Sequence, residues 1–374
     1  VNGTQVQMYN LARALACRGH EVHFVVASSS ARGSTDVVEK IRLHWISVGR
    51  KANPWFREIG PVGLTLDGIN PDVVYQRGRS HLTYVAGRWA ARNRKRFVWG
   101  SNGEDSCEFW KSIGRLARSH RPLWKKFILY HYFAALDLLI HRGIRASSSV
   151  INQTDHQRDR LKTNYAKQGY VLPSYFPCRP PTTKHEKERV VLWLANSSPG
   201  KQPHLFLDLA GRCSSSTEWQ FLLGGPIPET AYGRALKEKA ERIPAVSVVG
   251  AVPFDKSGAY YARASLFVST SMPEADGLPN AFIQAWQNGT PLLSLHHDPN
   301  GWIETKGLGY CAKGDIEQFF ENGQRLLGDV EALRQMGTRC EKFAREQFGN
   351  PAIVDTFLEI LGDQVPGNDV DGEV

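Results

Sequence analysis

The sequence predicts an α/β protein built from two doubly wound, parallel-sheet domains. Short apolar segments of strand length alternate with helical segments along the chain, as in repeated βαβ units. This alternation occurs twice, once on each side of a proline-rich stretch at residues 172–187. The chain has 374 residues, of which 41% are hydrophobic, which is enough for about two domains that each have a core.

The first half contains helices with one apolar face and short apolar strands. Met8, Leu11, Ala12 and Leu15 recur at helical spacing, and Gly19 follows as a stop signal. Short, mostly apolar runs are typical of strands buried in a parallel sheet. The predicted elements are a helix at 4–17, strands at 21–27, 41–48 and 72–76, a helix at 81–92, a strand at 96–100, a long helical region, a strand at 148–152, a helix from 154, and a strand at 170–172.

The second half repeats this rhythm. Its predicted strands, with helical patterns between them, are 189–195, 219–224, 246–250, 265–270 and 291–295. We therefore expect an N-terminal domain at 1–172, a linker at 173–188, and a second domain at 189–374 that includes the C-terminal helices. Doubly wound domains bind ligands at the carboxyl ends of their strands, so one cleft between the domains is expected.

The chain enters its first helix almost directly after Val1. A doubly wound domain normally begins with a strand that leads into this loop. We therefore expect that a strand of ~5–6 residues precedes Val1, and that the chain is a fragment that folds poorly and is inactive without it.

Composition excludes several classes of protein. Charged residues make up 22% of the chain, a fraction that is ordinary for a globular protein and not typical of a disordered one. The six cysteines are far apart, which indicates reduced thiols and no zinc site. The longest apolar run, 127–140, contains His131 and Asp137 and is too short for a membrane span of ~20 residues. We expect a cytoplasmic protein.

Positive charge is concentrated in the first half. Residues 1–170 contain 27 Lys and Arg against 12 Asp and Glu, whereas residues 171–374 contain 19 against 25. The stretch 111–126 has six Lys and Arg and no acid, and aromatic residues continue it to residue 140. This pattern favours peripheral binding of region 110–140 to an anionic membrane surface, on the inner face of a membrane. The alternative is an ordinary packed helix with a basic outer side. No nucleic-acid-binding module is recognisable.

The densest group of polar residues lies at 269–294. A predicted strand ends near Thr270, a loop with Glu274 and Asp276 follows, and a helix begins near Asn280. A helix start offers N–H groups and a partial positive charge, which suits a diphosphate. The two carboxylates suit sugar hydroxyls, and Gln284 lies one turn into the helix, where it suits a ribose. Either carboxylate alternatively serves only as a helix cap.

Several segments together resemble a known family. They are GTQVQMYNLARALACRGHEVHFVV, PDVVYQRG, VLWLANSSPGKQPHLFLDLA, YYARASLFVSTS and EADGLPNAFIQAW. In order and spacing they resemble the retaining, GT-B-fold glycosyltransferases of family 4, across nearly the whole chain. The resemblance implies two Rossmann-like domains that face each other across a cleft.

The resemblance also implies an activity and a set of site residues. A sugar would pass from a UDP- or GDP-sugar to a glycan, lipid-linked or small-molecule acceptor, with retention of configuration and with no cofactor or metal. The implied catalytic residues are Glu274, Asp276 and Lys201. The implied substrate-binding residues are Gly3, Gly224, Gly277, Leu278, Pro279, Asn280 and Gln284.

Several positions depart from the family pattern. Gln284 replaces a second Glu, Asn196 replaces an Arg, and Ser101–Asp105 stands where the family often has a His. These departures leave open a catalytically impaired protein that binds the sugar donor. A second alternative is a GT-B enzyme of another reaction, a sugar-nucleotide epimerase.

Overall fold

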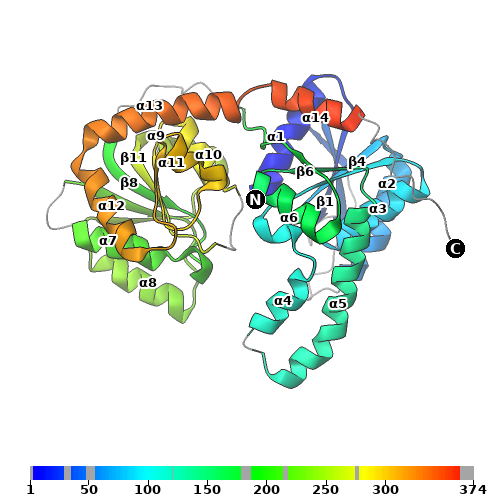
Figure 1. Ribbon diagram of the computed structural model, residues 1–374, viewed down its shortest axis with the longest axis horizontal. Helices are drawn as coiled ribbons and strands as arrows, with labels where there is room; N and C mark the ends of the chain where they lie inside the picture. Colours follow the sequence, from blue (N-terminus) through cyan, green and yellow to red (C-terminus); the bar gives the residue numbers. More distant parts are fainter. Residues whose placement is uncertain are drawn as a thin grey trace. The chain divides into compact units, whose positions relative to one another are not determined.

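The chain folds into two compact units. The structure, a computed structural model, describes residues 3–28, 35–47, 55–119, 121–177, 187–213, 218–273 and 278–362. One unit comprises the chain up to Tyr175 together with the chain from Pro351 onward, and the other comprises Phe176–Asn350. Each unit is described by itself below (Figure 1).

The N-terminal unit alternates strands and helices. Its elements are α1 (Gly3–Cys17), β1 (Val22–Ser28), β2 (Thr35–Val38), β3 (Ile41–Ser47), η1 (Trp55–Glu58), α2 (Ile59–Ile69), β4 (Val73–Arg77), α3 (His81–Arg92), β5 (Arg96–Gly100), η2 (Glu104–Cys107), α4 (Lys111–Arg118), α5 (Leu123–Arg145), β6 (Ser149–Asn152), α6 (Asp155–Tyr165), β7 (Tyr170–Val171) and α14 (Ala352–Gly362). A parallel sheet has the order β4-β5-β6-β7, and a smaller sheet has the order β1-β3-β2.

The β4–β7 sheet is buried on both faces. Phe97 and Trp99 of β5 pack on one side, in a cluster with residues of α2, α3, α5 and α6. Val98, between them in sequence, points to the opposite side, where it clusters with Leu11 of α1 and with four residues of α14. Alternate residues of a strand face opposite sides of a sheet, so β5 serves both cores.

Helix α14 packs in the N-terminal unit, although the sequence analysis assigned the C-terminal helices to the second domain. Its Phe357 ring meets the Tyr75 ring edge-on at 5.2 Å. Arg18 at the end of α1 forms an ion pair with Asp355 at 2.8 Å and donates to the Pro351 carbonyl at 3.0 Å. The assignment of residues 351–362 is thus corrected, because α14 supplies the apolar cover for the Val98 face of the sheet.

The small sheet contains a strand that the sequence analysis missed. β1 and β3 pair in parallel, as expected for strands 21–27 and 41–48. The additional strand β2 pairs antiparallel with β3. All four residues of β2 are exposed, so its sequence lacks the apolar pattern of a buried strand. The expected strand ahead of Val1 stays a prediction.

Helices α4 and α5 form a hairpin that extends away from the sheets of this unit (Figure 1). Its base is held by a buried ion pair in which Arg79 Nη2 lies 2.8 Å from Asp137 Oδ1. Asp137 also accepts hydrogen bonds from the backbone N–H groups of Ser112 and Ile113, at the start of α4. Tyr165 lies in the same cluster, bonded to Arg79, and burial raises the pKa of its hydroxyl to about 12. One carboxylate thus joins both helices of the hairpin to the body of the unit.

The C-terminal unit has a six-stranded parallel sheet of order β10-β9-β8-β11-β12-β13. Its elements are β8 (Glu188–Leu194), η3 (Pro199–Lys201), α7 (Pro203–Cys213), β9 (Gln220–Gly224), α8 (Ala231–Glu241), β10 (Val246–Gly250), α9 (Phe254–Arg263), β11 (Ala264–Ser269), α10 (Asn280–Gln287), β12 (Leu292–Ser294), η4 (Pro299–Gly301), α11 (Trp302–Thr305), β13 (Gly309–Cys311), α12 (Ile316–Gly328) and α13 (Val330–Gln347). The strand order reverses between β8 and β11, which marks the switch point where doubly wound sheets bind ligands.

The predicted α/β class with two doubly wound domains is confirmed. Every strand expected from the sequence is present within a few residues, and the missed strands are β2 and β13. Cys17, Cys107, Cys213, Cys311 and Cys340 are free thiols, and Cys178 lies outside the described residues. Among the helices that the structure describes, none combines the length and the apolar character needed to span a bilayer.

Candidate active site

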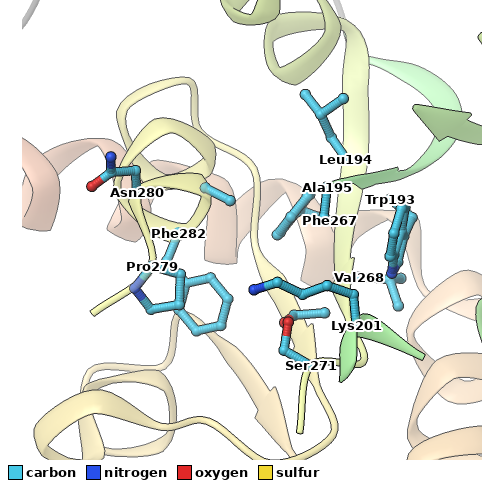
Figure 2. A pocket seen from close by; sticks show the side chains of 12 residues that line it. Trp193, Leu194, Ala195, Lys201, Phe267, Val268, Ser271, Pro279, Asn280 and Phe282 are labelled. Carbon is cyan, nitrogen blue, oxygen red and sulfur yellow. The ribbon is translucent and has the colours of Figure 1, made fainter. Parts of the chain in front are cut away.

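A pocket of about 150 Å³ lies in the C-terminal unit, at the carboxyl ends of β8 and β11 and at the start of α10. These elements meet at the switch point of the sheet, since β8 and β11 are neighbours that lead to opposite edges. The lining residues are Trp193, Leu194, Ala195, Lys201, Phe267, Val268, Ser269, Ser271, Pro279, Asn280, Ala281 and Phe282. Figure 2 shows how these side chains surround the pocket.

Lys201 is the charged side chain among the lining residues. In Figure 2 it extends toward the side of the pocket that holds Pro279 and Phe282. Its backbone is fixed by Thr270, whose hydroxyl donates to the Lys201 carbonyl at 2.7 Å and accepts from the Trp193 indole at 3.0 Å. The Met272 N–H also donates to the Gly200 carbonyl at 2.8 Å. Contacts with residues far apart in sequence thus fix the backbone of Lys201, so that its charged side chain is held beside the end of β11.

The start of α10 forms the opposite wall. Pro279 occupies the N-cap position and provides no side-chain hydrogen bond to the first turn. A helix start without such a cap directs backbone N–H groups and the positive end of the helix dipole outward. Together with the Lys201 ammonium, this wall favours a ligand with concentrated negative charge, such as a diphosphate.

The predicted site residues fall into three groups. Lys201, Pro279 and Asn280 line the pocket, and the catalytic and substrate-binding roles expected of them stay predictions. Leu278 is buried beside them and is not among the lining residues. Glu274, Asp276 and Gly277 lie outside the described residues, and their roles stay predictions. The flanking residues Ser271 and Pro279 both border the pocket.

Two other predicted positions, Gly3 and Gly224, are not among the residues that line the pocket. Gly3 is the first residue of α1 in the N-terminal unit. Gly224 ends β9, and the next residue, Gly225, has a φ of +120°. A Cβ at Gly225 would lie 1.7 Å from the Ala195 carbonyl oxygen, so this turn requires glycine for the close approach of the two strand ends. Asn196, in the place of the family Arg, is exposed.

Gln284 lies one turn into α10, as predicted, and its side chain contacts α9. The Ser257 hydroxyl oxygen is 2.7 Å from Gln284 Oε1 and also 2.7 Å from the Phe254 carbonyl oxygen. This contact fixes the amide of Gln284 at the edge of α10. The ribose role of Gln284 stays a prediction.

Sequence reasoning did not identify the apolar part of the lining. Trp193 and Phe267 lie near the ends of their strands, and Phe282 lies in the first turn of α10. All three are buried, so their sequence pattern resembles that of ordinary core residues. The signal that was available is their place at the carboxyl ends of predicted parallel strands.

Comparison with known families decides the class of protein. Residues 1–169 match the model described as Glycosyltransferase Family 4, and residues 188–329 match the model described as Glycosyl transferases group 1. The two matches follow the two units and together span most of the chain. Each half of the chain therefore belongs to a glycosyltransferase family.

Solved structures share the fold of this glycosyltransferase. HepE of Anabaena, in complex with UDP-glucose, is 15% identical, with a TM-score of 0.69 over 97% of this chain and 96% of that one. Sucrose-phosphate synthase of Thermosynechococcus elongatus is 14% identical, with a TM-score of 0.71 over 96% and 93%. WaaG, a glycosyltransferase involved in lipopolysaccharide biosynthesis, is 15% identical, with a TM-score of 0.68 over 98% and 97%.

One curated relative is similar to part of the glycosyltransferase. It is the lipopolysaccharide core biosynthesis glycosyltransferase LpsE of Rhizobium meliloti (strain 1021), which is 26% identical over 109 residues. The match covers 29% of this chain and 32% of the relative, so this chain spans about a third of the length of that protein.

Proposed function

We propose that the C-terminal unit binds a UDP- or GDP-sugar in the Lys201 pocket, and that the enzyme transfers the sugar to a glycan, lipid-linked or small-molecule acceptor. The observation that carries this proposal is the convergence of the Lys201 side chain and the uncapped start of α10 on one cavity. The complex of HepE with UDP-glucose supports the choice of donor class, because that protein shares the fold.

In this reaction the bond between the anomeric carbon and the diphosphate oxygen breaks, and the acceptor oxygen forms the new bond. The acceptor hydroxyl releases its proton to solvent, and the diphosphate leaves with one additional negative charge. The Lys201 ammonium and the first-turn N–H groups of α10 would stabilise that charge as it develops. Glu274 or Asp276 would hold the sugar hydroxyls, and we propose retention of configuration with no metal.

The test is a comparison of Lys201→Ala with Lys237→Ala, an exposed lysine on α8 of the same unit. Loss of one charge-stabilising group is expected to lower kcat by roughly 10²-fold in the Lys201 variant, whereas the Lys237 variant keeps wild-type turnover. Thermal-shift measurements with UDP, GDP and their sugars identify the donor, because a ligand at 100 times its Kd adds about 2.7 kcal/mol of stability.

Two results would contradict the proposal. One is full turnover in Lys201→Ala. The other is the appearance of an epimerised nucleotide sugar when the enzyme is incubated with donor and no acceptor, which would indicate an epimerase.

A further inference from the structure

The hairpin of α4 and α5 carries an exposed apolar face near its tip. On α5, Leu123, Trp124, Phe127 and Ile128 are exposed by 83%, 62%, 73% and 62%. Isolated apolar side chains are common on protein surfaces, whereas a contiguous group of this kind marks an interaction site. Tyr130 and Leu138 extend the group along the helix.

These side chains lie on one side of α5. At 100° per residue, the positions 123, 124, 127, 128, 130 and 138 fall within about 160° of the helix circumference. Lys126 lies just outside one edge of this arc, and Lys125 lies just outside the other edge. Lys125 Nζ is 5.1 Å from the centre of the Trp124 ring. Long cationic side chains beside an apolar face can keep their charged ends in water while the apolar groups next to them are buried.

The charge around the face has one sign. Residues 109–136 contain six Lys and Arg and no Asp or Glu. Asp105 pairs with Lys111 and approaches Arg115 at 4.0 Å. Within the described ranges, Arg118, Arg121, Lys125 and Lys126 form no ion pair. The tip of the hairpin therefore presents uncompensated positive charge next to apolar side chains.

The face is presented on an ordered support. Asp137 at the base of α5 is fully buried, pairs with Arg79, and caps the start of α4. Nearer the tip, Lys126 Nζ donates to the Ala117 carbonyl at 2.7 Å and joins the two helices. The hairpin extends beyond the sheets of the N-terminal unit (Figure 1), so a broad surface can reach its tip.

We propose that this hairpin docks the enzyme on an anionic bilayer surface. Leu123, Trp124, Phe127 and Ile128 enter the boundary between headgroups and acyl chains, and the neighbouring Lys and Arg side chains contact lipid phosphates. A bilayer fits better than a nucleic acid, because the aliphatic side chains of Leu123 and Ile128, which offer no face for base stacking, are at least as exposed as Trp124. It fits better than a second copy of this chain, because two copies of one basic face repel each other.

The experiment measures binding to vesicles by co-sedimentation, without sugar donor or acceptor. Vesicles of equimolar phosphatidylcholine and phosphatidylglycerol are compared with vesicles of phosphatidylcholine alone, at low and high salt. We expect binding to the anionic vesicles that weakens with salt, and little binding to the neutral ones. Vesicle binding is measured without turnover, so this proposal can be contradicted while the proposed glycosyl transfer still holds, and the reverse.

Variants separate the two parts of the surface. Phe127→Gln with Ile128→Gln tests the apolar face, and Arg118→Gln with Lys125→Gln tests the charge; each pair is expected to weaken binding at least tenfold. The matched controls are Leu64→Gln, an exposed leucine on α2, and Arg234→Gln, an exposed arginine on α8. Both controls should bind as the wild type does.

Further results would overturn the proposal. Equal binding to neutral and anionic vesicles would contradict the role of charge, and unchanged binding of Phe127→Gln with Ile128→Gln would contradict insertion. A concentration-dependent dimer that this double variant abolishes, with no vesicle binding by the wild type, would assign the face to a second copy instead. Circular dichroism of each variant establishes that it is folded.

Discussion

Ser257 and Gln284 form a contact that determines which way the Gln284 amide faces. The Ser257 oxygen is 2.7 Å from two acceptors, the Phe254 carbonyl and Gln284 Oε1. A hydroxyl has one proton, so it cannot donate to both at once. The hydroxyl therefore donates to one of these two oxygens at a time, and Gln284 Oε1 is the amide atom that faces Ser257. The Gln284 NH₂ group, turned away from Ser257, is then the part of the amide that we expect to donate to a ribose oxygen of the donor.

At this residue we predict that Gln284→Leu raises the KM for the sugar donor by roughly tenfold, with little change in kcat, because one hydrogen bond worth about 1.4 kcal/mol is lost. A donor that lacks one ribose hydroxyl should show little further loss with the variant, since the two changes remove the same contact. Gln287→Leu, on the same helix, is the control, because its amide donates to the Phe176 carbonyl. Fully additive losses in KM would contradict the ribose role.

Pocket residues at the start of a helix and in the loop after a strand were predictable, and the buried aromatic residues of the lining were not. Lys201, Pro279 and Asn280 were found from the sequence because a strand end followed by a helix start has recognisable local signals. Trp193 and Phe282 have the pattern of core residues, and they meet at the pocket only because β8 lies beside β11. That neighbour relation depends on strand order, which local periodicity does not determine.

At the scale of elements, Asp137 joins two helices and the body of the N-terminal unit. The sequence analysis noted Asp137 only as a charge within the apolar run 127–140. In the structure it is fully buried, pairs with Arg79, and accepts hydrogen bonds from backbone N–H groups at the start of α4. Sequence alone did not reveal this role, because the partners of Asp137 are 58 and 25 residues away.

We predict that Asp137→Leu lowers the free energy of unfolding of the N-terminal unit by about 3–5 kcal/mol, because the Arg79 guanidinium is left buried without its counter-charge. Urea denaturation followed by circular dichroism measures the change. The double variant Arg79→Met with Asp137→Leu should recover part of the loss, since no buried charge remains unpaired. A single variant as stable as the wild type would show that the pair contributes nothing.

At the scale of the whole molecule, the two units do not follow the order of the chain. Helix α14 is next to α13 in sequence, yet it completes the core of the N-terminal unit. We predict that Phe357→Ala lowers the stability of the N-terminal unit by about 3–5 kcal/mol and leaves the other unit unchanged. Phe319→Ala, in the core of the C-terminal unit, should lower the stability of that unit and leave the N-terminal unit unchanged. Calorimetry that resolves the two transitions measures both effects, and a lowered C-terminal transition in Phe357→Ala would contradict the assignment.

The position of α14 has a consequence for synthesis on the ribosome. The N-terminal unit is the first to be made, but the sheet face around Val98 and Ile151 stays without its cover until the chain beyond Asn350 has emerged. At ~5–20 residues per second, roughly 10–35 seconds pass between the synthesis of Tyr175 and that of Pro351. During that interval the C-terminal unit is produced as one continuous stretch, while the N-terminal unit presents an apolar surface to chaperones and proteases. The first unit to be translated therefore cannot complete its core until the whole of the other unit has been synthesised.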